Sequence, residues 1–275
     1  MNKDNFNMPL IGFGTWKLPN SEETIEIVKN AIDSGYRLID TAKAYGNETY
    51  IGRGIKASSI KREELFITGK LWNSDRDNVE EACLSTISKL DCDYLDLYLM
   101  HWPASKAVHE DWILINKRVW EQLEKLYDKG LVKAIGVCNF NKLQLEELLK
   151  TARIKPFVNQ IEFHPGFRQE ETLDFCFKNN ILVEAWSPLG SGKLLKKKPL
   201  QDMALKYNKT PADVCIAFSI QNNVIPIVKT RNKDRMISNL KAVEFKLSSE
   251  DLNSLNNLPY IGGSGLDSFT ITIFD

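Results

Sequence analysis

The feature that most constrains the fold is a regular alternation of two kinds of segment along the 275 residues. Runs of strand length, rich in β-branched and other apolar residues, recur between segments whose apolar residues are spaced as on one face of a helix. The predicted strands are residues 37–40, 65–68, 94–100, 132–137, 157–161, 181–185 and 224–228, with a weaker eighth at 242–245. The predicted helices carry the apolar stripes Ile25/Val28/Ile32, Val79/Cys83/Ile87, Ile115/Val119/Leu123/Leu126, Leu145/Leu148/Leu149, Leu173/Cys176/Phe177, Val214/Ala217/Phe218 and Met236/Ile237/Leu240.

Eight strand–helix units of roughly 30 residues each are what a closed barrel of parallel strands requires. A doubly wound open sheet is the alternative, but one that binds a dinucleotide normally has a glycine-rich loop after its first strand. Here the early glycine pair, Gly12 and Gly14, precedes the first full strand. We therefore predict an α/β fold, a (β/α)8 barrel of the TIM type in one domain over residues 1–275. Residues 8–12 and 14–17 are predicted to form an N-terminal β-hairpin that closes the bottom of the barrel.

The composition narrows the range of partners. The 36 Lys and Arg residues balance 36 Asp and Glu residues, so no strong positive field attracts nucleic acid or an anionic membrane surface. The N-terminus lacks the apolar segment of a secretory signal, and no apolar run approaches the ~18 residues of a membrane span. We expect a soluble, cytoplasmic protein, and nothing in the sequence argues against a monomer.

Three histidines without ligand spacing predict no metal site, and an odd number of scattered cysteines fits reduced thiols. These cysteines are Cys83, Cys92, Cys138, Cys176 and Cys215.

Polar residues follow the predicted strands at their carboxyl ends. Barrels of this type place their active sites at that end, so these side chains should converge on one rim. They are Asp40 and Tyr45, Lys70, His101 and Trp102, Cys138 and Asn139, Gln160, Trp186 and Ser187, and Lys229 and Thr230.

Four of these residues form a set suited to acid catalysis. A lysine at the end of an apolar strand needs a carboxylate to compensate its charge, and Asp40 on the neighbouring strand is the partner expected for Lys70. An ammonium beside a phenol lowers the pKa of the phenol, so Lys70 should bring Tyr45 toward the working range of a general acid. His101 should hydrogen-bond the same substrate oxygen. Each residue alone also fits a structural role, but their convergence favours catalysis.

A basic cluster follows the seventh predicted strand. It consists of Lys229, Thr230 and Arg231, with Arg235 and Asn239 in the helix that comes next. Backbone N–H groups at a helix start, combined with Lys and Arg side chains, make a phosphate site. A solvated run of charge is the plainer alternative.

Longer motifs in these places resemble the aldo-keto reductase family from end to end of the chain. The resemblance is strongest to its short bacterial and protozoal members, which act like diketogluconate reductases or protozoal prostaglandin F synthases. The matching stretches are residues 35–42, 45–48, 70–74, 99–103, 135–140, 158–165 and 185–190. They cover most of the predicted rim.

The resemblance implies a catalytic tetrad of Asp40, Tyr45, Lys70 and His101, the same residues that the strand ends select. It implies NADP(H) as the cofactor, which delivers hydride to a carbonyl carbon while the tyrosine protonates the oxygen. Nicotinamide contacts would come from Cys138, Asn139, Gln160 and Trp186, and pyrophosphate contacts from Ser187, Leu189 and Ser191. The adenosine 2′-phosphate side would be held by Lys229, Thr230, Arg231, Arg235 and Asn239. Thr15 and Trp16 would also contact the cofactor, and Trp16, Trp72, His101 and Trp102 would contact a small carbonyl substrate.

Three positions depart from the family pattern. Cys138 stands where Ser is usual and hydrogen-bonds more weakly, whereas Trp186 replaces Tyr and keeps a stacking face. Ser238 replaces a Glu that contacts the adenine. The loop at 104–112 and the tail at 262–275 are short compared with those of the vertebrate members of the family, which implies a wide, less discriminating substrate pocket.

Two functions from different classes fit these observations. The first is NADPH-dependent reduction of aldehydes and ketones with Tyr45 as the general acid. The second is an NADP(H)-binding regulatory or scaffold protein that keeps the barrel but turns over very slowly. The intact tetrad favours the enzyme, and no extension of the chain is suited to docking.

Overall fold

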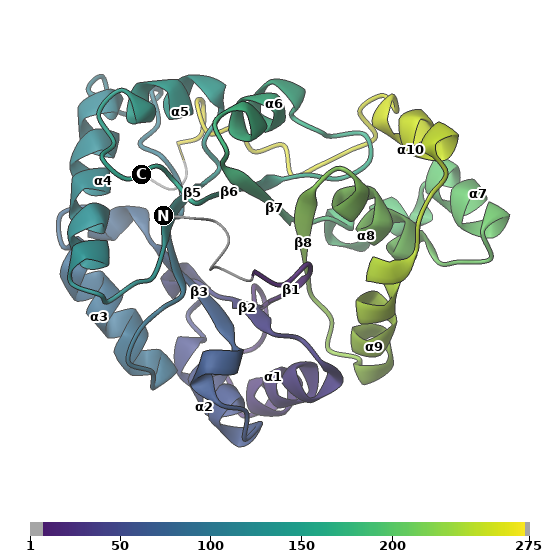
Figure 1. Ribbon diagram of the computed structural model, residues 1–275, viewed down its shortest axis with the longest axis horizontal. Helices are drawn as coiled ribbons and strands as arrows, with labels where there is room; N and C mark the ends of the chain where they lie inside the picture. Colours follow the sequence, from purple (N-terminus) through teal and green to yellow (C-terminus); the bar gives the residue numbers. More distant parts are fainter. Residues whose placement is uncertain (1–7, 273–275) are drawn as a thin grey trace.

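The computed structural model describes residues 8–272 and contains, within that range, a closed barrel of eight parallel strands (Figure 1). Each strand pairs with the next along the chain, and the eighth closes the barrel on the first. The strands are β1 (Gly12–Gly14), β2 (Leu38–Asp40), β3 (Phe66–Leu71), β4 (Leu97–Met100), β5 (Ile135–Cys138), β6 (Val158–Glu162), β7 (Leu182–Trp186) and β8 (Val224–Val228). The predicted (β/α)8 barrel is confirmed.

Helices surround the strands on the outside of the barrel, as Figure 1 shows. They are α1 (Glu23–Ser34), α2 (Glu48–Ala57), α3 (Val79–Leu90), α4 (Trp112–Asp128), α5 (Lys142–Leu149), α6 (Glu170–Lys178), α7 (Lys198–Lys206), α8 (Pro211–Gln221), α9 (Lys233–Lys241) and α10 (Ser249–Asn256). The apolar stripes located seven of these but missed α2, α7 and α10. Both α7 and α10 pack on α8 at the periphery. Within residues 8–272 no helix is long and apolar enough to cross a membrane.

Helix α2 escaped prediction because two glycines interrupt its apolar stripe. A Cβ atom at Gly52 would lie 2.6 Å from the backbone oxygen of Leu90, and one at Gly54 would lie 2.7 Å from the Cβ of Val28. Both distances are shorter than real contacts, so glycine is what allows α2 to pack closely on α1 and α3.

Two predictions at the ends of the barrel are wrong. The expected N-terminal hairpin over residues 8–12 and 14–17 does not form. Instead, β1 (Gly12–Gly14) is itself a barrel strand, parallel to both β2 and β8. A Cβ at Gly12 would come within 2.4 Å of the Ile227 side chain, so this first strand approaches its neighbours too closely for a side chain. The weak eighth strand predicted at 242–245 is a 3-10 turn, η7 (Ala242–Glu244).

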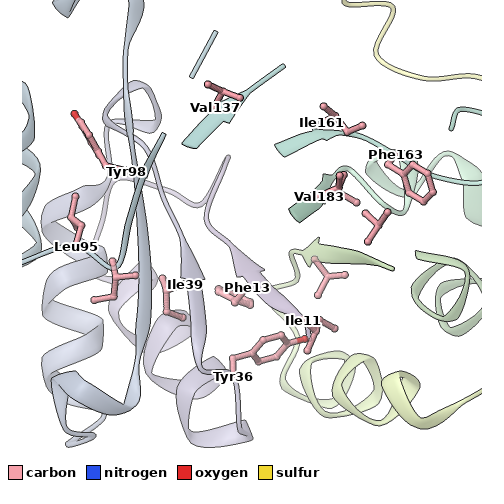
Figure 2. Packing of buried hydrophobic residues seen from close by; sticks show 14 of the residues in the cluster. Ile11, Phe13, Tyr36, Ile39, Leu95, Tyr98, Val137, Ile161, Phe163 and Val183 are labelled. Atoms are coloured by element: carbon pink, nitrogen blue, oxygen red, sulfur yellow. The ribbon is translucent and has the colours of Figure 1, made fainter. Parts of the chain in front are cut away.

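The apolar core has two parts, separated by the wall of the barrel. Outward-facing side chains such as Ile39, Val137, Ile161 and Val183 pack against the helices (Figure 2). Inward-facing side chains alternate with them along each strand. A second, smaller apolar cluster consists of Leu38, Phe66, Leu97, Leu99, Ala134, Cys138, Val158 and Ile227.

Further along the same strands, polar residues take over the inward-facing positions. Asp40 follows Leu38 by two residues, Gln160 follows Val158 by two, and Lys70 lies on the inward side of β3. All three are buried. The candidate site is therefore built on the carboxyl ends of rigid strands, above an apolar floor.

Candidate active site

A buried ion pair lies inside the carboxyl end of the barrel. The Nζ atom of Lys70 is 2.7 and 2.6 Å from the two carboxylate oxygens of Asp40, and it also donates to the Thr41 carbonyl oxygen at 3.1 Å. Lys70 is fully buried, so this charge persists only because partners surround it. Burial by itself lowers the pKa of Lys70, but the Asp40 carboxylate together with Tyr45 and Cys138 more than offsets this effect, and the net pKa is raised. Lys70 is therefore an ammonium across the neutral range.

Tyr45 is placed next to this ammonium by the loop after β2. It lies in a short 3-10 helix, η2 (Lys43–Tyr45), and its hydroxyl oxygen accepts a hydrogen bond from Lys70 Nζ at 3.2 Å. Gly46 ends the helix at a φ of 68°, a conformation that favours glycine, and Lys43 pairs with Asp75 at 2.7 Å. Because the ammonium occupies the phenol oxygen, the phenol hydrogen is left for another acceptor.

The predicted direction of the Tyr45 pKa is wrong. Burial raises it above its ordinary value of 10 by more than the Lys70 ammonium lowers it, and the charge of Asp40 adds to the rise. Tyr45 is therefore protonated at neutral pH.

His101 follows β4 and completes the predicted tetrad. Its ring packs edge-on against those of Tyr45 and Trp72, with centroid distances of 5.7 and 5.2 Å. Burial lowers the pKa of His101 well below 6.5, and the charge of Lys70 lowers it further, so the imidazole is neutral. Its Nδ1 atom has no hydrogen-bond partner within residues 8–272. A neutral imidazole beside Tyr45 is suited to hydrogen-bonding a ligand oxygen.

The residues predicted to hold a nicotinamide lie together at the ends of β5, β6 and β7. Asn139 has a left-handed φ of 64°, donates from Nδ2 to the His101 carbonyl oxygen at 3.0 Å, and accepts at Oδ1 from Trp186 Nε1 at 2.7 Å. The Sγ atom of Cys138 lies 3.2 Å from Asn139 Nδ2 and 3.8 Å from Gln160 Oε1. This patch directly adjoins the tetrad.

The loop after β7 has a strained backbone. Ser187 and Ser191 both adopt left-handed φ angles, 49° and 53°, and their hydroxyl oxygens are 3.3 Å apart. Leu189 between them packs against the core. Such strain in residues other than glycine persists where the surrounding structure imposes it, often at ligand sites.

The basic cluster after β8 carries more positive charge than its surroundings neutralise. Partial burial and the charges of Arg231 and Lys17 lower the pKa of Lys229. Arg231 has an exposed partner, Glu23, at 3.3 Å. Thr230 precedes α9 and Arg235 lies in its first turn, so the helix start adds further attraction for an anion.

Two of the predicted cofactor contacts are buried in structural roles. Thr15 is fully buried, and its hydroxyl donates to the Asp40 carbonyl oxygen at 2.9 Å. Asn239 is buried on α9, near the Tyr36 hydroxyl, which donates to the Met236 carbonyl oxygen at 3.3 Å. The contact of Thr15 and Asn239 with a cofactor stays a prediction.

The three tryptophans predicted to line the mouth differ in exposure. Trp16 is 47% exposed, with Lys17 Nζ 4.1 Å from its ring centroid, and Trp72 is half-buried against His101. Trp102 is only 5% exposed. Their contact with a substrate stays a prediction for all three.

The sequence analysis missed three buried polar residues around the site. Glu184 is fully buried on β7 and accepts from Gln160 Nε2 at 2.7 Å. Asn47 donates to the backbone of the β1–α1 loop, and Glu162 at the end of β6 accepts from Ser264 of the C-terminal tail. The signal for Glu184 was present: it is a charged residue within an otherwise apolar strand.

The site combines a phenol, a buried ammonium and a neighbouring basic cluster, and comparisons with known proteins show the family of the chain. The sequence model described as the Aldo/keto reductase family matches residues 10–259. The chain belongs to this family. It is 46% identical over 253 residues to glyoxal reductase of Bacillus subtilis (strain 168), covering 91% of this chain and 89% of that protein. It is 42% identical over 256 residues to the 9,11-endoperoxide prostaglandin H2 reductase of Trypanosoma cruzi (strain CL Brener), covering 91% and 88%.

Solved structures give the same result. MGS-M4, an aldo-keto reductase from a Medee basin deep-sea metagenome library, matches with a TM-score of 0.90 at 36% identity, over 98% of each chain. The resemblance seen in the sequence is confirmed. This aldo/keto reductase is an oxidoreductase that acts on carbonyl groups, and its family uses nicotinamide cofactors.

The residues of this aldo/keto reductase fit a phosphorylated nicotinamide cofactor. The excess positive charge around Lys229 suits its phosphates. The Trp186 ring and the Asn139 amide lie beside His101 and Tyr45, and an aromatic face and an amide together suit a nicotinamide.

Proposed function

We propose that the protein reduces small aldehydes and ketones to alcohols with NADPH, and that Tyr45 is the general acid. The observation that carries this proposal is the contact between Lys70 Nζ and the Tyr45 hydroxyl at 3.2 Å, with Lys70 itself held by Asp40. No simpler structural role requires an ammonium to be buried against a phenol at the rim of a barrel.

The protein side of the reaction follows from these contacts. A bound nicotinamide supplies the hydride that reduces the carbonyl carbon. Tyr45 Oη gives its proton to the carbonyl oxygen as negative charge develops there. The Lys70 ammonium then stabilises the phenolate, and Asp40 keeps Lys70 charged and in place. Neutral His101 orients the substrate oxygen by a hydrogen bond without competing for the proton.

We propose NADPH rather than NADH because of the basic cluster. Lys229, Arg231 and Arg235 gather beside the start of α9, where a 2′-phosphate would find both charge and backbone N–H groups. All the proposed site residues belong to one chain, so a monomer would suffice. The cytoplasmic location stays a prediction.

Small aldehydes are the favoured substrates. Trp16 and Trp72 leave the mouth with apolar walls, and the relative with 46% identity is a glyoxal reductase. The relative with 42% identity reduces a prostaglandin endoperoxide by its name, so similarity alone does not select one substrate.

The test is the oxidation of NADPH, followed by absorbance, with a panel that includes glyoxal, methylglyoxal and larger ketones. Wild type should turn over at least one small aldehyde, and Tyr45→Phe should lose about 10²- to 10⁴-fold in kcat because its ring has no proton to give. Turnover that survives in Tyr45→Phe would refute the role of Tyr45. Tight NADPH binding without turnover on any carbonyl would refute the enzyme and favour a cofactor-binding regulatory role.

A further inference from the structure

A second carboxyl group lies inside the barrel behind the tetrad. Gln160 on β6 and Glu184 on β7 are direct neighbours in the strand register. The Nε2 atom of Gln160 donates to Asp40 Oδ2 at 2.8 Å and to Glu184 Oε2 at 2.7 Å. Gln160 is 1% exposed and Glu184 is 0% exposed. One amide group thus bridges the tetrad aspartate to a carboxyl that the proposed mechanism does not use.

The charges in this interior do not balance if both carboxyl groups are ionised. Lys70 contacts both oxygens of Asp40, and Glu184 accepts only from the Gln160 amide. Oε1 of Glu184 has no hydrogen-bond partner among the described residues. Burying a carboxylate without a neighbouring cation costs free energy. Glu184 must therefore either be protonated or lower the stability of the folded protein.

We infer that Glu184 is a positioning residue, which holds Gln160 against Asp40 and, by its charge, sets how readily Tyr45 releases its proton. This inference rests on the proposed reductase function. It assigns a role to a residue that touches neither the substrate nor the hydroxyl that donates the proton.

Among the ionisable groups in this part of the barrel, Glu184 is the one expected to titrate in the mildly alkaline range. Burial and the charge of Asp40 raise the pKa of Glu184 to about 8, against a smaller lowering by Gln160 and Lys70. The other groups that face it are Lys70 on β3 and Cys138 on β5, whose pKa values are raised by Asp40 and by burial respectively.

The remaining neighbours do not titrate in that range. Tyr45 has a raised pKa and His101 a lowered one, and the side chains of β1 (Gly12–Gly14) and β8 (Val224–Val228) do not ionise. Lys229, whose pKa is also lowered, lies at the cofactor cluster, so saturating NADPH removes its influence from kcat.

Ionisation of Glu184 adds a negative charge beside the Asp40–Lys70 pair. That charge holds the proton on Tyr45 more tightly, so carbonyl reduction should slow as the pH rises through about 8. A shift of about one unit in the pKa of the proton donor changes the rate by about three- to tenfold, depending on how far the proton has moved in the transition state.

The experiment measures kcat from pH 6 to pH 10 at saturating NADPH and aldehyde, for wild type, Glu184→Gln and a control, Glu124→Gln. Glu124 is also buried, but it lies on α4 and accepts from the Ile154 backbone outside the barrel. Wild type and Glu124→Gln should lose about three- to tenfold in kcat above pH 8, whereas Glu184→Gln should stay flat, within about twofold of wild type at pH 7. An unchanged alkaline decline in Glu184→Gln, or no decline in wild type, would overturn the inference.

A second measurement keeps the inference testable if Glu184→Gln does not fold or wild type has no turnover. Infrared difference spectra of wild type between pH 6 and pH 9 should show a protonated buried carboxyl that disappears with a midpoint near 8. Glu184→Asp should keep such a titration but lower kcat, because its shorter side chain no longer reaches Gln160. Absence of the infrared band overturns the inference, whereas absence of turnover with the band present overturns only the proposed function.

Discussion

Removal of the buried lysine is the perturbation whose effect the structure defines best. Lys70 is fully buried, and Lys70→Met keeps an unbranched chain of similar length while deleting the ammonium. The deletion removes both contacts to Asp40, at 2.7 and 2.6 Å, and leaves that carboxylate with the Gln160 amide as its side-chain donor. Breaking a buried ion pair by removing one partner costs roughly 3 to 5 kcal/mol.

A double variant separates this loss of stability from the loss of activity. Asp40→Asn combined with Lys70→Met leaves no uncompensated charge, so at least half of the lost free energy of unfolding should return. Activity should not return, because nothing then stabilises the Tyr45 phenolate. We expect kcat to fall about 10²- to 10³-fold in both Lys70→Met and the double variant.

The assay is urea unfolding of wild type, both single variants and the double variant, with NADPH oxidation measured on the same preparations. Surface pairs offer the matched control, since removing the exposed Lys198–Asp202 pair should change the free energy of unfolding by less than about 1 kcal/mol. If Lys70→Met is as stable as wild type, or if the double variant is no more stable than Lys70→Met, then the buried Asp40 carboxylate does not depend on Lys70 for compensation.

Three further predictions concern pH, the cofactor and the rim. Folding raises the pKa of Glu184 from 4.5 to about 8, so the stability it contributes is complete below about pH 4.5 and is lost as the pH rises toward 8. Glu184→Gln should therefore gain roughly 3 to 5 kcal/mol over wild type between pH 5 and pH 9 in urea titrations, and parallel pH curves would contradict this. Lys229→Ala should raise the KM for NADPH about tenfold while changing that for NADH little; an equal effect on both cofactors would show that the cluster does not bind the 2′-phosphate. NADPH should change the fluorescence of Trp186, because a carboxamide bound by Asn139 displaces the indole N–H from its Oδ1 atom; a signal of equal size in Trp186→Phe would contradict this.

The barrel and the convergence of Asp40, Tyr45, Lys70 and His101 were predictable because they depend on local patterns. Parallel strands that are covered on both faces have nearly continuous apolar sequences. The polar residues at their carboxyl ends must therefore lie at the same end of the barrel. This reasoning placed Asp40, Lys70 and His101 from the sequence alone. Tyr45 was predictable as the phenol nearest to that rim, although only the three-dimensional structure shows that burial outweighs Lys70 in setting its pKa.

The errors arose where packing overrides local pattern. The three residues of β1 are too short and too rich in glycine to read as a strand, and their glycines are required by contacts with Leu38 and Ile227 that are distant in sequence. The missed prediction of α2 has the same cause, because Gly52 is required by a close contact with the Leu90 backbone, which is distant in sequence. Glu184 is hard to assign from sequence because it is a single charged residue inside an apolar strand, and the groups that compensate it lie on other strands.

The most direct test of the central claim follows the hydride itself. Wild type would be incubated with methylglyoxal and NADPH carrying deuterium at the transferred position of nicotinamide C4, and the alcohol product analysed by mass spectrometry. We expect one deuterium in the alcohol that wild type produces, and almost no alcohol from Tyr45→Phe. Alcohol without deuterium, or deuterated alcohol formed equally fast by Tyr45→Phe, would contradict it.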